Sequence, residues 1–171
     1  MVESPVDPPW VRTMANTPMF VGLVANDWNK LEFIMAFVAA PLMGVSIPIA
    51  RVTLYAMNPP ARRDYLSAVL AIGPWPDSVK ARVENYIKEF ERLRRRRNDV
   101  VHGRWDFTPA EGDDLKPVLR VMSGRSDPKD VATEQEVKDI IKTVNEIQHL
   151  QTETISLGQH LQSLIPTNMR R

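Results

Sequence analysis

The 171-residue sequence contains no cysteine. Thiol catalysis, disulfide bonds and cysteine-ligated zinc are therefore excluded. The three histidines, His102, His149 and His160, also lack the spacing of a metal-ligand motif such as HExxH. We therefore expect neither a metal site nor a cofactor.

An excess of charge of one sign is also missing, since the formal net charge is only +1. Any attraction to a nucleic acid must then be local. The basic residues are concentrated in one place, where five of the six positions 92–97 are arginine. Composition is otherwise ordinary for a globular chain, with 43% hydrophobic and 25% charged residues, and the length suits one domain with a core.

The sequence has no long uninterrupted hydrophobic run. Residues 33–50 carry no charged side chain and reach the lower length for a membrane span, but Pro41, Gly44 and Pro48 interrupt them. We interpret this stretch as a buried helix followed by the start of another, and we expect a cytoplasmic protein without a membrane span. A membrane-associated protein that uses residues 33–50 is an alternative. The acidic, proline-containing N-terminus does not resemble a signal peptide.

Apolar residues that recur every three or four positions predict helices along most of the chain. The predicted fold is all-α, an up-and-down bundle of four to five helices with a short irregular or hairpin insert before the last helix. The predicted helices cover residues 17–43, 48–57, 61–72, 79–102 and about 134–164. The predicted domain organisation is an extended N-terminal arm at 1–15, a single helical domain at 16–165 and a basic tail at 166–171.

The insert covers residues 104–131, which contain glycines, prolines and acidic pairs. One alternating run at 117–122 predicts a small hairpin with residues 104–107. Thr133 and Glu136 have the spacing of a capping box, which places the start of the last helix at Thr133.

The helix predicted at 79–102 carries the arginine cluster at its C-terminal end. Its apolar stripe contains Val83, Ile87 and Phe90. At about 100° per residue, Arg94 and Arg97 fall on this stripe, whereas Arg95 and Arg96 point elsewhere. Solvated arginines are expected off the apolar stripe, so the position of Arg94 and Arg97 on it requires an explanation. One explanation is that this surface lines a groove that binds an anion.

Arg97 and Asn98 are followed by His102 and Gly103, with Trp105 two residues later. An Arg, a polar residue and a His after four to six positions resemble the signature of the HEPN superfamily (higher eukaryotes and prokaryotes nucleotide-binding). Asn98 favours Arg97 as the motif arginine, while the neighbouring arginines at 95 and 96 satisfy looser intervals and stay open as alternatives. The resemblance is strongest over residues 17–43, 79–107 and the last helix.

The resemblance implies a helical bundle and, in members that are enzymes, a metal-independent endoribonuclease that works as a homodimer with the two motifs facing each other. His102 would take the 2′-hydroxyl proton or protonate the leaving 5′ oxygen, and its place at a helix C-terminus favours the protonated form. Arg97 would hold the phosphate and stabilise its growing charge. Asn98 would orient His102 or contact ribose.

Arg94, Arg96 and Arg104 are the predicted substrate-binding residues. The expected substrate is RNA, in the manner of a toxin or defence ribonuclease, and a neutralising protein is a further expected partner. Five positions on a helix separate Arg97 from His102 by roughly 140° around the axis. We therefore predict that one chain does not easily bring both side chains to one phosphate and that a two-fold dimer does.

Ordinary structural roles are the alternatives to these interpretations. A histidine before a helix-ending glycine is often only a favourable C-terminal cation. An arginine cluster is often a solvated face with ion pairs, for which Glu84, Glu89 and Glu91 are available, or a nucleic-acid or targeting patch without catalysis. The alternative function is accordingly a non-catalytic HEPN-like scaffold or a module that binds nucleic acid or a protein partner.

Overall fold

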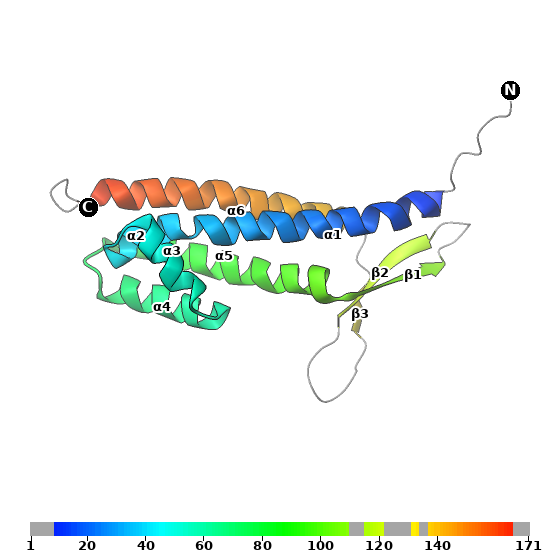
Figure 1. The fold of residues 1–171 in the computed structure, drawn as a ribbon, viewed down its shortest axis with the longest axis horizontal. Helices are drawn as coiled ribbons and strands as arrows, with labels where there is room; N and C mark the ends of the chain where they lie inside the picture. Colours follow the sequence, from blue (N-terminus) through cyan, green and yellow to red (C-terminus); the bar gives the residue numbers. More distant parts are fainter. Residues whose placement is uncertain (1–8, 110–114, 122–130, 134–136, 166–171) are drawn as a thin grey trace, which may run out of the picture. The chain divides into compact units, whose positions relative to one another are not determined.

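The computed structural model describes residues 9–109, 115–121, 131–133 and 137–165. These residues form six helices and three strands (Figure 1). In chain order they are α1 (Pro9–Ile34), α2 (Ala36–Met43), α3 (Ile47–Tyr55), α4 (Pro59–Ile72), α5 (Asp77–His102), β1 (Arg104–Pro109), β2 (Leu115–Val121), β3 (Val131–Thr133) and α6 (Val137–Leu164). The fold is an all-α bundle, as predicted, and the strands are confined to the insert before the last helix.

The chain divides into two compact units. Unit 1 consists of Met1–Asn26 and Arg95–Asn145, and unit 2 consists of Asp27–Arg94 and Glu146–Arg171. Helices α1, α5 and α6 each contribute residues to both units. The single domain predicted at 16–165 stays a prediction.

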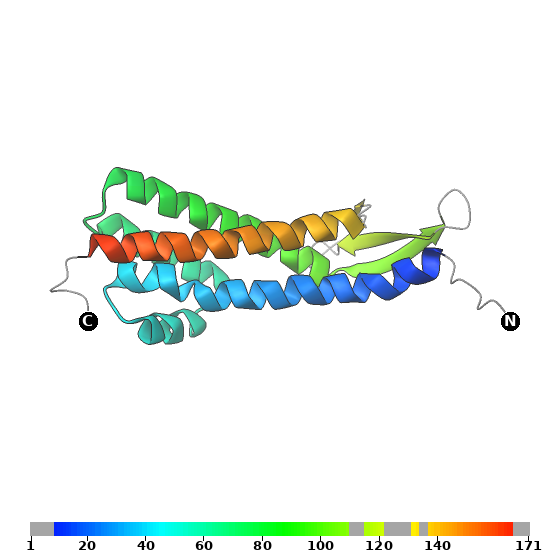
Figure 2. The same ribbon diagram turned by 90° about the horizontal axis from the view of Figure 1, so that it is seen from above.

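The core of unit 2 is built from the apolar stripes that the sequence predicts. Within this unit the C-terminal part of α1 lies beside α6 (Figures 1 and 2). The ring of Trp28 on α1 lies 4.7 Å from that of Phe90 on α5, measured between centroids. From α6, the side chains of Ile147, Leu150, Leu157 and Leu161 are buried. In unit 1, the buried apolar residues include Val24, Val100, Ile140 and Val144.

Helix α1 begins earlier than expected. The extended arm predicted at 1–15 is wrong for residues 9–15, because α1 begins at Pro9, and residues 1–8 lie outside the described part of the chain. Proline is favourable in the first turn of a helix, where its missing N–H needs no partner and its fixed φ suits the helix. Pro9 therefore starts a helix rather than preventing one.

Several helix ends follow local rules. The helix predicted at 17–43 is divided at Met35 into α1 and α2. Its end is where the sequence predicts it, and Gly44 there adopts the left-handed conformation, with φ of 65°. Pro48 lies in the first turn of α3, also as predicted. Asn58 caps α4, since its side-chain oxygen accepts a hydrogen bond of 2.9 Å from the backbone N–H of Ala61.

The insert forms a three-stranded antiparallel sheet with the order β1-β2-β3. The predicted hairpin is confirmed, since β1 pairs with β2 and Phe107 lies opposite Pro117. The predicted capping box is wrong, because Thr133 lies in β3 opposite Leu119. Threonine is β-branched and suits a strand. Glu136 lies outside the described residues, and α6 begins at Val137.

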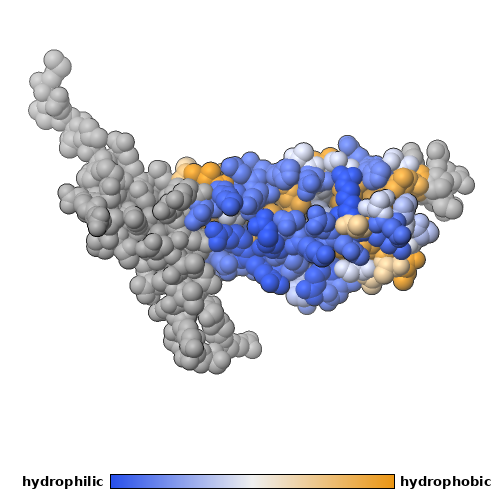
Figure 3. All heavy atoms as spheres, turned by 180° about the vertical axis from the view of Figure 1, so that it is seen from behind, coloured by the Kyte–Doolittle hydropathy of each residue, from blue (hydrophilic) through white to orange (hydrophobic). Residues whose placement is uncertain are grey.

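No single helix in the described ranges is both long and apolar enough to cross a membrane. Thr17–Met43 and Ile47–Tyr55 pass together on length and composition, with a bend of 112° between them. Hydrophilic residues cover most of the coloured surface in the view of Figure 3, with smaller apolar patches among them.

Candidate functional site

The three predicted catalytic residues lie at the C-terminal end of α5, within unit 1. The Nη1 atom of Arg97 is 3.0 Å from Oδ1 of Asn98 and 3.1 Å from Nε2 of His102. Arg97 and Asn98 are half-buried, whereas His102 is exposed. The structure therefore joins the motif arginine, asparagine and histidine into one hydrogen-bonded cluster.

This cluster corrects the prediction that one chain does not easily bring Arg97 and His102 together. Their positions differ by roughly 140° around the helix axis, but the long arginine side chain spans that interval. His102 is the last residue of α5, and the N–H of Gly103 closes the final turn on the carbonyl of Asp99 at 2.9 Å. A dimer is therefore not needed for the two side chains to meet.

The hydrogen bond also assigns the role of each nitrogen in this contact. A guanidinium has donors only, so the Nε2 atom of His102 must accept. In this contact the ring proton therefore lies on Nδ1, and Nε2 presents its lone pair to Arg97.

Arg97 has an unused donor. Its Nε atom is buried and has no hydrogen-bond partner among the residues that the structure describes. A buried donor without an acceptor is unfavourable. Arg97 therefore stands to gain a further hydrogen bond from any acceptor that reaches its Nε or makes the side chain turn.

Arg94 has a different environment from Arg97. Its guanidinium donates to both carboxylate oxygens of Glu91, from Nε at 3.2 and 3.1 Å and from Nη2 at 3.0 Å. Glu91 is only 8% exposed. Neutralisation of this buried carboxylate accounts for the position of Arg94 on the apolar stripe without a substrate.

The other predicted substrate-binding residues have separate places. Arg96 is half-buried, and its Nε lies 3.4 Å from the hydroxyl of Thr143 on α6. Arg104 begins β1, and its backbone pairs with that of Arg120, while its side chain lies outside the described part. Arg95 is exposed. The structure thus gathers Arg97, Asn98 and His102 and gives Arg94 and Arg96 other partners.

Arg92 joins two helices. It contacts Glu89 on α5 at 3.0 Å and Glu146 on α6 at 3.1 Å. Partial burial opposes its charge, but the hydrogen bonds to Glu89 and Glu146 outweigh that effect and raise the pKa of Arg92. Glu89 and Glu91 are partners that the sequence suggests. Glu146 is not, because its approach depends on how α6 packs against α5.

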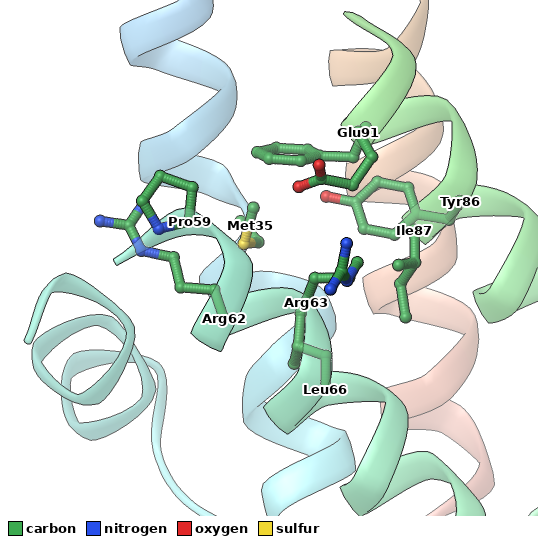
Figure 4. Close-up of a pocket in the computed structure, with 9 residues that line it drawn as sticks. Met35, Pro59, Arg62, Arg63, Leu66, Tyr86, Ile87 and Glu91 are labelled. Atoms are coloured by element: carbon green, nitrogen blue, oxygen red, sulfur yellow. The ribbon is translucent and has the colours of Figure 1, made fainter. Parts of the chain in front are cut away.

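A pocket in unit 2 lies between α4 and α5 (Figure 4). Its empty space, open solvent included, is about 270 Å³. Its lining residues are Met35, Pro59, Arg62, Arg63, Leu66, Tyr86, Ile87, Phe90 and Glu91. None of Arg97, Asn98 and His102 lines it. Its charged groups also have partners, since Arg62 is paired with Glu32 and Glu91 with Arg94.

Neither a metal site nor a similar protein identifies the function of the cluster. Within the described ranges, no group of three His, Asp or Glu side chains is placed to hold a metal ion. No family model, curated protein or solved structure matches the chain. The resemblance to HEPN proteins therefore depends on the motif residues themselves, of which Arg97, Asn98 and His102 form one cluster at the end of α5.

Proposed function

We propose that this protein is a metal-independent endoribonuclease of the HEPN type, acting as a toxin or defence enzyme. The observation that carries the proposal is the cluster of Arg97, Asn98 and His102 at the end of α5. It combines a guanidinium, which suits a phosphate, with an imidazole whose Nε2 atom serves as an acceptor.

The chemistry needs few protein groups because RNA supplies its own nucleophile, the 2′-hydroxyl. His102 Nε2 accepts the 2′ proton while the 2′ oxygen bonds to phosphorus and the bond to the 5′ oxygen breaks. The products are a 2′,3′-cyclic phosphate and a 5′-hydroxyl, which takes its proton from an acid. Arg97 donates to the nonbridging oxygens as their charge grows, and Asn98 positions Arg97 through its hydrogen bond at 3.0 Å.

A homodimer remains part of the proposal. It is needed for the acid and the base of the reaction, not to bring Arg97 and His102 together. In-line displacement places the attacking and leaving oxygens on opposite sides of the phosphorus. One imidazole does not serve both sides. A second copy of the chain, related by a two-fold axis, supplies a second His102, which acts as the acid in its protonated form and gives that proton to the leaving 5′ oxygen.

RNA cleavage in the presence of a chelator tests the proposal. We expect the wild type to cut RNA and to leave 2′,3′-cyclic phosphate ends, and RNA with 2′-O-methyl groups to resist. His102→Ala and Arg97→Ala should each lower the rate by at least about 100-fold, since a general base or a transition-state donor contributes that much. His149→Ala and Arg95→Ala are matched controls, because both residues are exposed and lie outside the cluster.

Two results contradict the proposal. One is equal cleavage by the wild type and both cluster variants, which would indicate a contaminating nuclease. The other is no cleavage of any RNA in a panel of structured and unstructured substrates, including messenger and transfer RNA.

A second candidate function is a module that binds nucleic acid or a protein partner without chemistry. It is favoured by the ion pairs of Arg92 and Arg94, which are typical of a structural helix face. It is also favoured by the pocket in unit 2, which none of the three cluster residues lines. Salt-sensitive RNA binding without turnover, weakened in Arg97→Ala, would support this candidate.

A further inference from the structure

The resting cluster occupies both groups that the proposed reaction needs. Arg97 Nη1 donates to His102 Nε2 at 3.1 Å. The nitrogen that would take the 2′ proton is therefore already accepting a hydrogen bond, and its donor is the side chain that would hold the phosphate. Neither group is ready for its role until this bond breaks.

A phosphate oxygen is a better acceptor for Arg97 than the imidazole of His102. Hydrogen bonds between a guanidinium and an anionic oxygen are shorter and roughly twice as strong as those to a neutral acceptor, and two parallel bonds are common. His102 is exposed at the end of α5. An oxyanion can therefore approach the contact from solvent.

The remaining contacts of Arg97 also allow this exchange. The carboxamide of Asn98 holds Nη1 at 3.0 Å and keeps the guanidinium beside the end of the helix. The Nε atom is buried and without a partner among the described residues, so an acceptor that turns the side chain towards solvent also satisfies a donor that has none at rest. Arg94, in contrast, is neutralised by Glu91, and an anion gains less there.

We propose that Arg97 is a switch that a phosphate-class oxyanion operates: the oxyanion takes the guanidinium and thereby releases Nε2 of His102. This inference builds on the proposed function of the same site. It adds that the resting protein keeps its base occupied and that substrate binding frees it.

Nuclear magnetic resonance of the three histidine imidazoles in the full-length protein tests the exchange. Inorganic phosphate is titrated in at fixed pH and constant ionic strength, with chloride as the counterpart. We expect the Nε2 resonance of His102 to shift as phosphate binds. The resonances of His149 and His160 should stay in place, because both residues lie exposed on α6, away from Arg97 in sequence and outside the cluster.

Substitutions identify the residue that transmits the effect. In Arg97→Gln, the His102 resonance should already differ without phosphate, and the affinity for phosphate should fall by at least about tenfold, since hydrogen bonds to a charged group are of that strength. Arg95→Gln, on the same helix and exposed, should behave like the wild type. Backbone spectra establish that both variants are folded, and Arg97→Lys provides a second variant that keeps the charge.

Each outcome bears on the proposal. The proposal is overturned if the His102 resonance does not shift on addition of phosphate, or if the resonances of all three histidines shift equally. It is also overturned if Arg97→Gln responds to phosphate as the wild type does. A short RNA blocked by 2′-O-methyl groups distinguishes a phosphodiester from free phosphate as the natural ligand. If the His102 resonance shifts with phosphate but no RNA is cleaved, the switch is supported and the ribonuclease proposal is contradicted. If RNA is cleaved but the resonance does not shift, the ribonuclease proposal is supported and the switch is contradicted.

Discussion

The arginines at 92–97 differ in function because they differ in their acceptors. Arg92 contacts two glutamates, and Arg94 contacts the buried carboxylate of Glu91. Arg97 contacts the neutral acceptors of Asn98 and His102. An ion pair already satisfies a guanidinium, while neutral acceptors leave its charge uncompensated. Among these three, Arg97 is the arginine with most to gain from a phosphate.

The residues of the cluster are predictable from the sequence, but their contact is not. The motif identifies Arg97, Asn98 and His102 through residue types and spacing. A helical projection places Arg97 and His102 roughly 140° apart and leaves side-chain reach out of account. The ion pair of Arg92 with Glu146 depends on how α6 packs against α5. A local sequence pattern does not predict that packing.

Asp27 is a second residue whose environment determines its contribution to stability. It is 4% exposed. Its carboxylate accepts from Lys30 at 2.8 Å and from Gln148 on α6 at 2.7 Å. Burial disfavours the charged form, but the hydrogen bonds of Lys30 and Gln148 and the charge of Lys30 together outweigh burial and lower the pKa of Asp27. The ionised carboxylate therefore stabilises the contact between α1 and α6.

This lowered pKa gives a pH dependence of stability with a definite sign. In the unfolded chain Asp27 takes up its proton near pH 4, before the folded form does. Its contribution is therefore present above about pH 4 and is lost as the pH falls through the lower folded pKa. Asp27→Asn should lower the free energy of unfolding by about 1–3 kcal/mol at neutral pH.

Urea unfolding at a series of pH values measures this effect. The difference between the wild type and Asp27→Asn should shrink below about pH 4. Asp64→Asn is the matched control, because this carboxylate is exposed and paired with an exposed Arg63. No measurable change is expected there. A difference for Asp27→Asn that stays constant down to pH 2 contradicts the explanation.

At the scale of elements, one glycine sets the distance between two helices. A Cβ atom placed on Gly158 of α6 would lie 2.7 Å from the carbonyl oxygen of Phe37 on α2. Pro41 lies four residues after Phe37 and has no N–H to bond with that carbonyl. This carbonyl, which receives no hydrogen bond from residue 41, faces α6 at the position where the absence of a side chain permits close approach.

Substitution of Gly158 tests this packing. Gly158→Ala should lower the free energy of unfolding by about 1–3 kcal/mol, because the methyl group meets backbone atoms that cannot turn aside. Gly22→Ala on α1 should instead raise it by up to about 1 kcal/mol, since alanine favours a helix and no atom of the described residues lies within 4 Å of the added carbon. Denaturant unfolding of both variants gives the comparison. Changes of the same sign would contradict the role of Gly158.

The elements follow from the sequence wherever periodicity is strong. The buried residues of α5 and α6 recur at the spacing that predicts them. The errors occur where a local cue has two meanings. Pro9 starts α1 rather than preventing it, and Thr133 joins β3 rather than capping α6. A strand of three residues is held by its neighbour β2, so its own sequence predicts it weakly.

At the scale of the whole molecule, the question is how many chains the reaction needs. Arg97 and His102 meet within one chain, so the proposed dimer is not required to bring them together. It is required if one His102 acts as the base and another as the acid. Light scattering gives the mass in solution, which should correspond to two chains. Mass alone does not establish that both imidazoles act on one phosphate.

Mixed dimers separate the two possibilities. Wild type and His102→Ala are refolded together in varied ratios, and RNA cleavage is measured at constant total protein. If both imidazoles are needed, activity falls as the square of the wild-type fraction, so an equal mixture keeps about one quarter of it. If each chain acts alone, the same mixture keeps about one half. We expect the quadratic dependence, with His149→Ala as the control that leaves activity unchanged at every ratio. A linear dependence would assign the proton of the leaving oxygen to water or to another group of the same chain.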